Sequence, residues 1–221
     1  MRLLQRDSSS ISGSESALLG FDEKHAGAVE LLAMTAGAPL DKGDTYVGIG
    51  VTMADAALSV RRSEQYGGKV VRPFDDYGYG ASLIPDEDEM VVKSVRYGWV
   101  HDPDGYLVEI IEGARAEPLG KVILNVLDLD ETVKFYTEKL GMNLHRRRAN
   151  INSKPKHASI CSFVSYDKTE DEGTMLELVY NYATERLNLG KALKHIVLKG
   201  NDKQQTKGEI VDPNCIPVEI L

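Results

Sequence analysis

The chain has little cysteine, no long apolar run and no excess of basic residues, and each shortage excludes a class of protein. Two cysteines among 221 residues are too few for a disulfide framework, so we expect a reducing compartment. No apolar stretch approaches the length needed to span a membrane. We therefore expect a soluble protein of the cytoplasm or of an organelle such as the plastid.

Acidic residues outnumber basic ones. The sequence holds 34 Asp and Glu against 26 Lys and Arg, a net charge of −8, which argues against a nucleic-acid partner. The only dense basic run, His145-Arg146-Arg147-Arg148, is interpreted as a solvated strand end rather than an anion-binding patch. A hydrophobic content of 42% with 27% charged residues is typical of a globular protein with one larger or two modest domains.

Several sequence patterns occur twice, and an internal repeat constrains architecture more than a single motif does. The repeated patterns place glutamates within apolar, strand-like runs. Met1–Asp7 returns as Met142–Arg148, Ala28–Leu32 as Met175–Val179, Tyr46–Val51 as His195–Gly200, and Asp102–Gly105 as Asp212–Cys215.

Apolar periodicity and turn residues predict a repeated unit of one strand, one helix and three strands. Residues 45–112 and 118–182 each match about one full unit, and Asp128 and Gly141 are expected to cap the ends of the second helix. We predict two domains, 1–113 and 118–221. The first unit lacks its opening strand and helix, and the last unit is shortened. Both losses would expose apolar sheet surface.

A set of short motifs is typical of one known family. The motifs are Leu127–Asp130 with Lys134–Tyr136 and Leu140–Met142, then Leu176–Tyr182, and Asp102–Tyr106. Together they resemble the glyoxalase I family of the vicinal-oxygen-chelate superfamily, in the tandem two-domain form of plants and algae. The resemblance covers nearly the whole chain. It implies an α+β fold in which tandem βαβββ modules form two curled mixed sheets.

In that family each metal site takes a His or Gln from two opening strands and a Glu from two later strands. The ion stabilises the charge of an enediolate, and a ligating glutamate moves the proton. The resemblance puts one site between units two and three, where Glu109 and Glu177 remain but Tyr46 and Lys121 replace the other ligands. Asn125 stands where the family has an arginine for the glutathione carboxylate. Because an ammonium repels a metal cation, we expect Lys121 to neutralise both glutamates in a buried ion pair.

The resemblance implies a second site between units one and four. Glu30, His195 and Glu219 occupy three of its four ligand positions, and one Zn or Ni ion is the implied cofactor. If the site is active, Glu30 or Glu219 shuttles the proton. Lys191, near the family's substrate-binding arginine position, and Asn181, at a substrate-contact position, would contact the substrate.

Simpler interpretations compete with these assignments. A strand glutamate is usually the solvent-facing member of an alternation, and a lone His195 is more often structural than a ligand. His101, His145 and His157 have no ligand-like spacing and are expected at the surface. The Tyr77–Gly80 segment is interpreted as a surface loop in preference to a substrate lid.

Three functions follow. In the first, which we favour, the protein is non-catalytic: a degenerate relative that acts as a structural or interaction protein, with a partner covering the exposed sheet edges. In the second, the protein is a lactoylglutathione lyase that isomerises the hemithioacetal of methylglyoxal and glutathione. In the third, the sequence is an incomplete or mis-spliced form of an active enzyme.

Overall fold

The structure is a computed structural model, and it describes residues 2–7, 16–21, 27–32, 41–77, 82–83, 90–91, 95–150, 158–182, 184–191, 193–199 and 208–221. Within these ranges the chain forms one ten-stranded sheet and two three-stranded sheets. No helix in the same ranges is long and apolar enough to cross a membrane. The mixed sheets and few helices agree with the predicted α+β class.

The ten-stranded sheet consists of two halves with mirrored strand order, β5-β8-β9-β4 and β10-β13-β12-β11, with β6 and β7 added at the far edge. The strands are β4 (Tyr46–Met53), β5 (Lys69–Asp76), β6 (Ser82–Leu83), β7 (Met90–Val91), β8 (Arg96–His101), β9 (Leu107–Glu112), β10 (Leu119–Val126), β11 (Asn143–Asn150), β12 (Ser159–Ser165) and β13 (Met175–Asn181).

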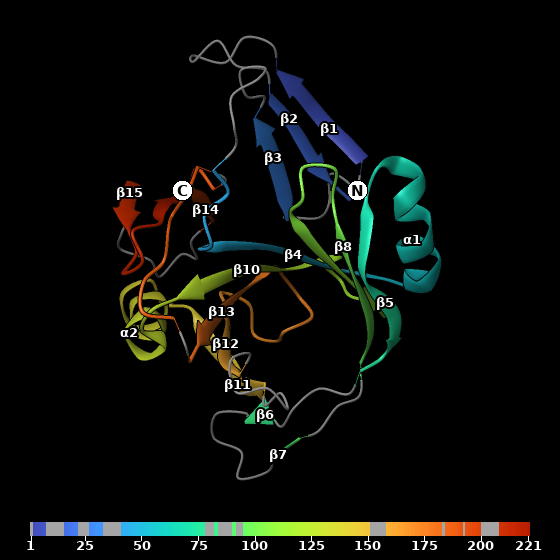
Figure 1. The fold of residues 1–221 in the computed structure, drawn as a ribbon. Helices are drawn as coiled ribbons and strands as arrows, with labels where there is room; N and C mark the ends of the chain where they lie inside the picture. Colours follow the sequence, from blue (N-terminus) through green and yellow to red (C-terminus); the bar gives the residue numbers. More distant parts are fainter. Residues whose placement is uncertain are drawn as a thin grey trace.

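Each half is built around its opening strand. In the first half β4 runs parallel to β9, and in the second half β10 runs parallel to β13. The two opening strands then pair antiparallel with each other, which joins the halves. Figure 1 shows the sheet curling into a U with β4 and β10 at its base. The predicted domains 1–113 and 118–221 therefore share this sheet, and the boundary between them stays a prediction.

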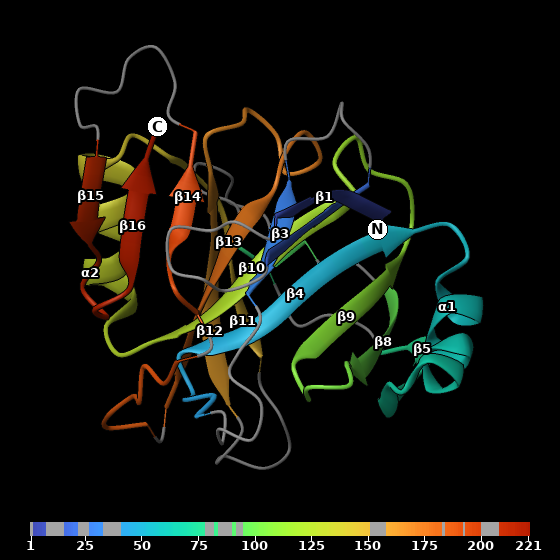
Figure 2. The ribbon, with the colours of Figure 1, turned by 90° about the horizontal axis from the view of Figure 1, so that it is seen from above.

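Two short sheets lie on the outer side of this base (Figures 1 and 2). One has the order β1-β2-β3, with β1 (Arg2–Asp7), β2 (Ser16–Gly20) and β3 (Ala28–Leu32); the other has the order β14-β16-β15, with β14 (Ile196–Leu198), β15 (Gly208–Val211) and β16 (Pro217–Ile220). The sequence predicted a second curled sheet. Among the described residues this sheet is instead two separate pieces, because β3 and β14 are both edge strands.

Both helices pack on the large sheet, and each shares a core cluster with one of the small sheets. Helix α1 (Ala56–Ser63) continues as the short helix η1 (Glu64–Tyr66), and it buries Ala56 and Val60. These residues join a core cluster with Val51 and Ile110 of the large sheet, against which Val29 of β3 also packs. Burial of this apolar surface is what holds β3 against the first half.

Helix α2 (Leu129–Lys134) continues as η2 (Phe135–Lys139) and buries Leu129, Val133 and Tyr136, whose spacing places them on one face. Its core cluster combines Val133 and Tyr136 with Leu178 of the large sheet and Ile196 and Val218 of the small sheet. The carboxylate of Asp128 accepts a hydrogen bond from Glu131 N at 2.8 Å, and Gly141 takes a φ of +73° just beyond the helix. Both predicted end residues are confirmed.

A buried carboxylate fixes the turn between β15 and β16. Asp212 Oδ1 accepts hydrogen bonds from Asn214 N at 2.8 Å and Ile216 N at 2.9 Å. Its Oδ2 accepts a bond from the Tyr136 hydroxyl at 3.2 Å, which ties the turn to α2. Cys215 adopts a φ of +65° where the repeated turn has Gly105 at +84°.

This network predicts unequal costs for two substitutions. Asp212→Ala leaves two backbone N–H groups without an acceptor and should lower the free energy of unfolding by roughly 2–4 kcal/mol. Tyr136→Phe removes only the hydroxyl bond and should cost about 1 kcal/mol. Urea denaturation at neutral pH measures both values, and equal losses would contradict the assigned role of Asp212.

Candidate functional site

Lys121 lies between two buried glutamates. Its Nζ is 2.5 Å from Glu109 Oε2 and 2.6 Å from Glu177 Oε2. The exposed fractions are 5% for Lys121, 5% for Glu109 and 4% for Glu177. The ion pair expected from the sequence is therefore present, and water is almost excluded from it.

Strand pairing across the seam brings these residues together. Lys121 on β10 lies opposite Gly50 on β4, and Gly50 lies beside Glu109 on β9. On the other side, Ile123 of β10 lies beside Glu177 on β13. A Cβ atom at Gly50 would come within 2.5 Å of Lys121 Cε, so the missing side chain at position 50 makes room for the lysine stem.

A second cation completes what we call the Lys121 centre, composed of Glu109, Lys121, Arg148 and Glu177. Arg148 Nη2 lies 3.0 Å from Glu177 Oε1, and Arg148 is only 6% exposed. Two cations thus face two carboxylates, so the group is formally neutral. Such pairing is what allows charges to remain buried.

The pKa of Glu177 reflects this balance. Burial alone would raise it, but the Lys121 ammonium and the Arg148 guanidinium outweigh burial and lower the pKa from 4.5 to about 2. Glu177 is therefore held ionised at neutral pH. A carboxylate with so low a pKa is a poor proton acceptor, which makes it a weak general base.

The basic run is not simply a solvated strand end. Arg148 is buried in the centre, and Arg146 Cζ lies 3.7 Å from the centroid of the Phe163 ring. Lys121 Nζ lies 5.8 Å and Arg148 Cζ 5.3 Å from the same centroid. Phe163, itself fully buried, thus presents its ring to three cations.

Sequence reasoning missed Gly50, Arg148 and Phe163. Arg146 and Arg148 are two residues apart, so strand alternation places them on one face, and that spacing was the available signal. Nothing in the sequence alone paired this face with Glu177, because β11 and β13 are joined through β12. The long-range register decided the contact.

Tyr46 does not occupy the position that mirrors Lys121. On β10, Lys121 lies two residues before Ile123, the residue that pairs with Glu177. On β4, the residue two before Gly50, which pairs with Glu109, is Gly48. Tyr46 instead lies with its ring 5.7 Å from that of Tyr106. Burial, followed by the nearby Asp102 carboxylate, raises the pKa of Tyr46 to about 12.

The donor set of the Lys121 centre does not fit a metal ion. Both carboxylates already bind Lys121, Glu177 also binds Arg148, and Gly48 offers no side chain. An ammonium has no lone pair to donate and repels a divalent cation. The carboxylates of this centre therefore serve the two cations of the chain itself rather than a metal-bound substrate.

The three ligands predicted for the second site are not brought together. Glu30 lies on β3, Glu219 on β16, and His195 immediately before β14, so they belong to two separate sheets. Among the described residues, no group of three or more His, Cys, Asp or Glu side chains is placed to share an ion. Within their own short sheet, His195 lies two residues before Val197, which pairs with Glu219.

Of the predicted substrate contacts, Asn181 ends β13 of the large sheet, and Lys191 lies outside the strands. Asn181 Nδ2 donates to Asn125 Oδ1 at 2.9 Å, and Asn125 Nδ2 donates to Asp44 O at 2.6 Å. Lys191 is exposed, and its backbone N–H donates to Asp41 O at 2.7 Å. These bonds join the 41–45 and 184–191 segments to β10 and β13.

The remaining histidine and loop predictions have mixed outcomes. His101 and His145 are partly buried rather than at the surface, and His145 Nε2 lies 2.8 Å from Ser165 Oγ. Desolvation lowers the pKa of His145. His157 and residues 78–80 lie outside the described residues. Tyr77 packs over the guanidinium of Arg72, with 3.7 Å between Cζ and the ring centroid.

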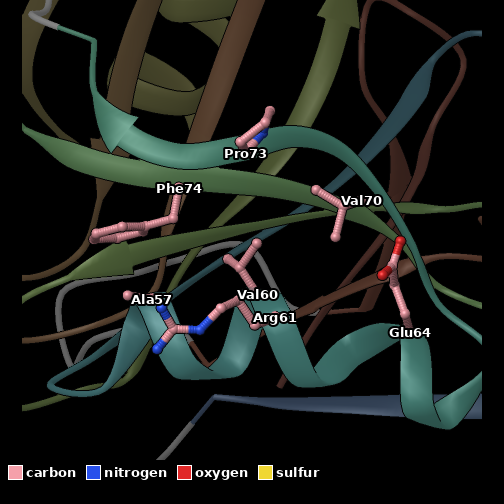
Figure 3. Close-up of a pocket in the computed structure, with 7 residues that line it drawn as sticks. All are labelled: Ala57, Val60, Arg61, Glu64, Val70, Pro73 and Phe74. Carbon is pink, nitrogen blue, oxygen red and sulfur yellow. The ribbon is translucent and has the colours of Figure 1, made fainter.

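A hollow of about 430 Å³ lies between α1 and β5 (Figure 3). It is lined by Ala57, Val60, Arg61 and Glu64 of the helix and by Val70, Pro73 and Phe74 of the strand. The lining is mostly apolar and has neither a nucleophile nor a pair of carboxylates, so we assign no chemistry to it.

The Lys121 centre predicts that the stabilities of wild type and of the Lys121→Met variant depend on pH in opposite directions. Wild type should lose stability as pH falls from 4.5 to about 2, because the folded-state pKa of Glu177 lies below its ordinary value. Lys121→Met should cost roughly 3–5 kcal/mol at neutral pH. The variant should recover stability on acidification, because buried carboxylates with less compensating charge have raised pKa values.

Urea denaturation between pH 2 and pH 7 tests these opposite pH dependences of stability. Lys134→Met, which removes an exposed lysine on α2, is the matched control and should follow the wild-type profile. Parallel profiles for wild type and Lys121→Met would contradict the account.

Known proteins resemble this chain in sequence and in fold. Residues 119–206 match the sequence model of the Glyoxalase/Bleomycin resistance protein/Dioxygenase superfamily. The chain is 31% identical over 210 residues to the "Probable lactoylglutathione lyase, chloroplastic" of Arabidopsis thaliana, covering 93% of this chain and 54% of that protein. It is 30% identical over 213 residues to a second lactoylglutathione lyase of the same plant, covering 96% of this chain and 69% of that protein.

The fold agrees with these relatives. The crystal structure of glyoxalase I from Zea mays superposes with a TM-score of 0.77 at 26% identity, over 99% of this chain and 82% of that one. This chain thus spans about half of one curated Arabidopsis relative and about two thirds of the other, at 54% and 69%. Sequence and fold together establish that the chain belongs to the glyoxalase family of this superfamily and has its vicinal-oxygen-chelate fold.

Proposed function

We propose that this chain is a glyoxalase I homologue that has lost catalysis and serves as a structural or interaction protein, as one subunit of a larger assembly. The observation that carries the proposal is the position of Lys121 Nζ, 2.5 Å from Glu109 and 2.6 Å from Glu177. A catalytic metal would need these carboxylates as ligands. The lysine supplies positive charge there without the vacant coordination positions that bind a substrate's oxygens.

Two further features support a non-catalytic role. Glu177 is a weak base because its pKa is about 2. The second predicted ligand set, Glu30, His195 and Glu219, is divided between two sheets. A structural role needs neither a general base nor a set of metal ligands, since it depends on the fold and on surfaces that a partner contacts.

A second candidate function is metal-dependent lactoylglutathione lyase, acting on the hemithioacetal of methylglyoxal and glutathione. The names of two relatives favour it. It would require Glu30, His195 and Glu219 to share one Zn or Ni ion, with Lys191 and Asn181 facing the substrate. The word chloroplastic in one relative's name also favours the plastid as the compartment, for either function.

Metal stoichiometry and turnover, measured on one preparation, separate the two candidates. The pure protein is reconstituted with nickel or zinc, dialysed, and assayed by elemental analysis and by lactoylglutathione formation. We expect no tightly bound equivalent and no turnover. The matched variants are His195→Ala/Glu219→Ala and Glu109→Ala/Glu177→Ala.

Each double variant tests a different part of the proposal. One equivalent of metal with turnover, both lost in His195→Ala/Glu219→Ala, would establish the lyase. Loss of metal only in Glu109→Ala/Glu177→Ala would mean that Lys121 does not exclude an ion from the centre.

A further inference from the structure

The Lys121 centre brings an amine and two carboxyl groups into contact inside the protein. Lys121 Nζ lies 2.5 Å from Glu109 Oε2 and 2.6 Å from Glu177 Oε2. The Cδ atom of Glu109 is one covalent bond beyond that oxygen, so the amine and the carboxyl carbon are close to the separation of about 3–3.5 Å from which bound groups react. An amine and a carboxyl group at this separation are the two reactants of an amide bond.

The surroundings of these groups favour amide formation over hydrolysis. Lys121 and Glu109 are each only 5% exposed, and the fully buried ring of Phe163 lies beside the lysine, with its centroid 5.8 Å from Nζ. Burial limits access of water, which would hydrolyse a new amide. Groups held in a reactive geometry behave as if present at about 10⁵–10⁸ M, and this proximity compensates for the low reactivity of a carboxyl group toward amines.

Arg148 selects which of the two glutamates reacts. Its Nη2 lies 3.0 Å from Glu177 Oε1, and a guanidinium stays protonated in proteins. Glu177 is therefore held ionised, with a pKa of about 2. A proton of Lys121 passes instead to Glu109, which turns two buried charges into a neutral amine and a neutral acid, the forms that a buried site favours. The neutral amine has the lone pair that an ammonium lacks.

The sheet holds the amine next to the carboxyl group of Glu109. Glu109 on β9 and Lys121 on β10 both pair with Gly50 of β4, from opposite sides. The lysine stem crosses β4 at this glycine, where a Cβ atom would come within 2.5 Å of Lys121 Cε. Glu177 contacts Nζ from the β13 side, which keeps the amine in place. Three neighbouring strands therefore fix the two reacting groups.

We propose that Lys121 Nζ and Glu109 Cδ join in an intramolecular amide, which links β9 to β10 across β4. The N–C bond forms as the bond from Cδ to one carboxyl oxygen breaks. Two of the three ammonium protons leave with that oxygen as one molecule of water, and the third stays on the amide nitrogen. Glu177 and Arg148 keep their opposite charges, so the centre stays neutral. The amide forms within the chain and needs no metal, partner or oxidant, so it is independent of the proposed function.

Mass spectrometry of the intact, full-length protein detects the amide directly. We expect folded wild type, incubated at neutral pH, to weigh one water less than its sequence requires. Protein that is purified in urea and never folded should have the full mass, because only the fold brings Lys121 and Glu109 together.

Tryptic digestion with tandem mass spectrometry locates the bond. Trypsin cleaves after Arg96, Arg115 and Lys134, so the linked product is residues 97–115 joined to residues 116–134. Lys121 itself should remain uncleaved in this product, because its side chain is no longer a free amine.

Two variants are matched controls. Lys121→Arg keeps a positive charge in the centre but offers no reactive amine, so it should retain its full mass. Glu112→Gln changes another glutamate of β9, one that pairs with Arg96 at the surface, and it should lose one water as wild type does. If Lys121→Arg perturbs folding, the mass and the digest of wild type still test the bond.

Three results would overturn the proposal. The first is the full mass in folded wild type. The second is a linked product that joins Lys121 to Glu177 in place of Glu109. The third is a loss of water that persists in Lys121→Arg, which would indicate cyclisation of Asp104 onto the backbone nitrogen of Gly105.

Discussion

The buried contact between Lys121 and two glutamates is the interaction on which the rest of this structure depends. It lies at the seam where β4 and β10 join the halves of the large sheet, so the charges of the centre must balance before the seam can close. Arg148 supplies the second positive charge from β11, three strands away from β10 in the sheet. The centre therefore connects strands from both halves, and its two cations balance its two buried carboxylates. A metal ion in the same place would satisfy the same electrostatic requirement and would also bring reactivity.

The outer layer follows a different constraint. Each helix packs on the large sheet and shares a core cluster with one short sheet, and apolar burial holds these elements together. This burial stabilises β3 and β14 from one side, yet it does not pair their free edges. The opening strands β4 and β10 thus pair next to the Lys121 centre, whereas β3 and β14 remain edge strands among the described residues. Both places lie where the resemblance predicted metal sites.

Much of the local structure could be predicted from the sequence. Asp128 and Gly141 mark the ends of α2 through short-range hydrogen bonding and backbone conformation, and these signals are local. The Lys121 pair was also predictable, because the family resemblance assigns Glu109, Glu177 and Lys121 to one ligand set. Arg148 and Gly50 were not, since their contacts depend on strand register. The prediction for Tyr46 was wrong for the same reason, because the pairing of β4 with β9 puts Gly48, not Tyr46, two residues before the neighbour of Glu109. The division of the second sheet depends on which strands pair, and periodicity does not report that.

The central claim is that Lys121 Nζ takes the place of a catalytic metal. Anomalous X-ray scattering from crystals soaked in zinc tests it most directly. The account predicts continuous density for the lysine side chain between Glu109 and Glu177, with no anomalous peak between the two carboxylates. An anomalous peak there, with the Lys121 side chain displaced, would contradict the account and restore this centre as a metal site.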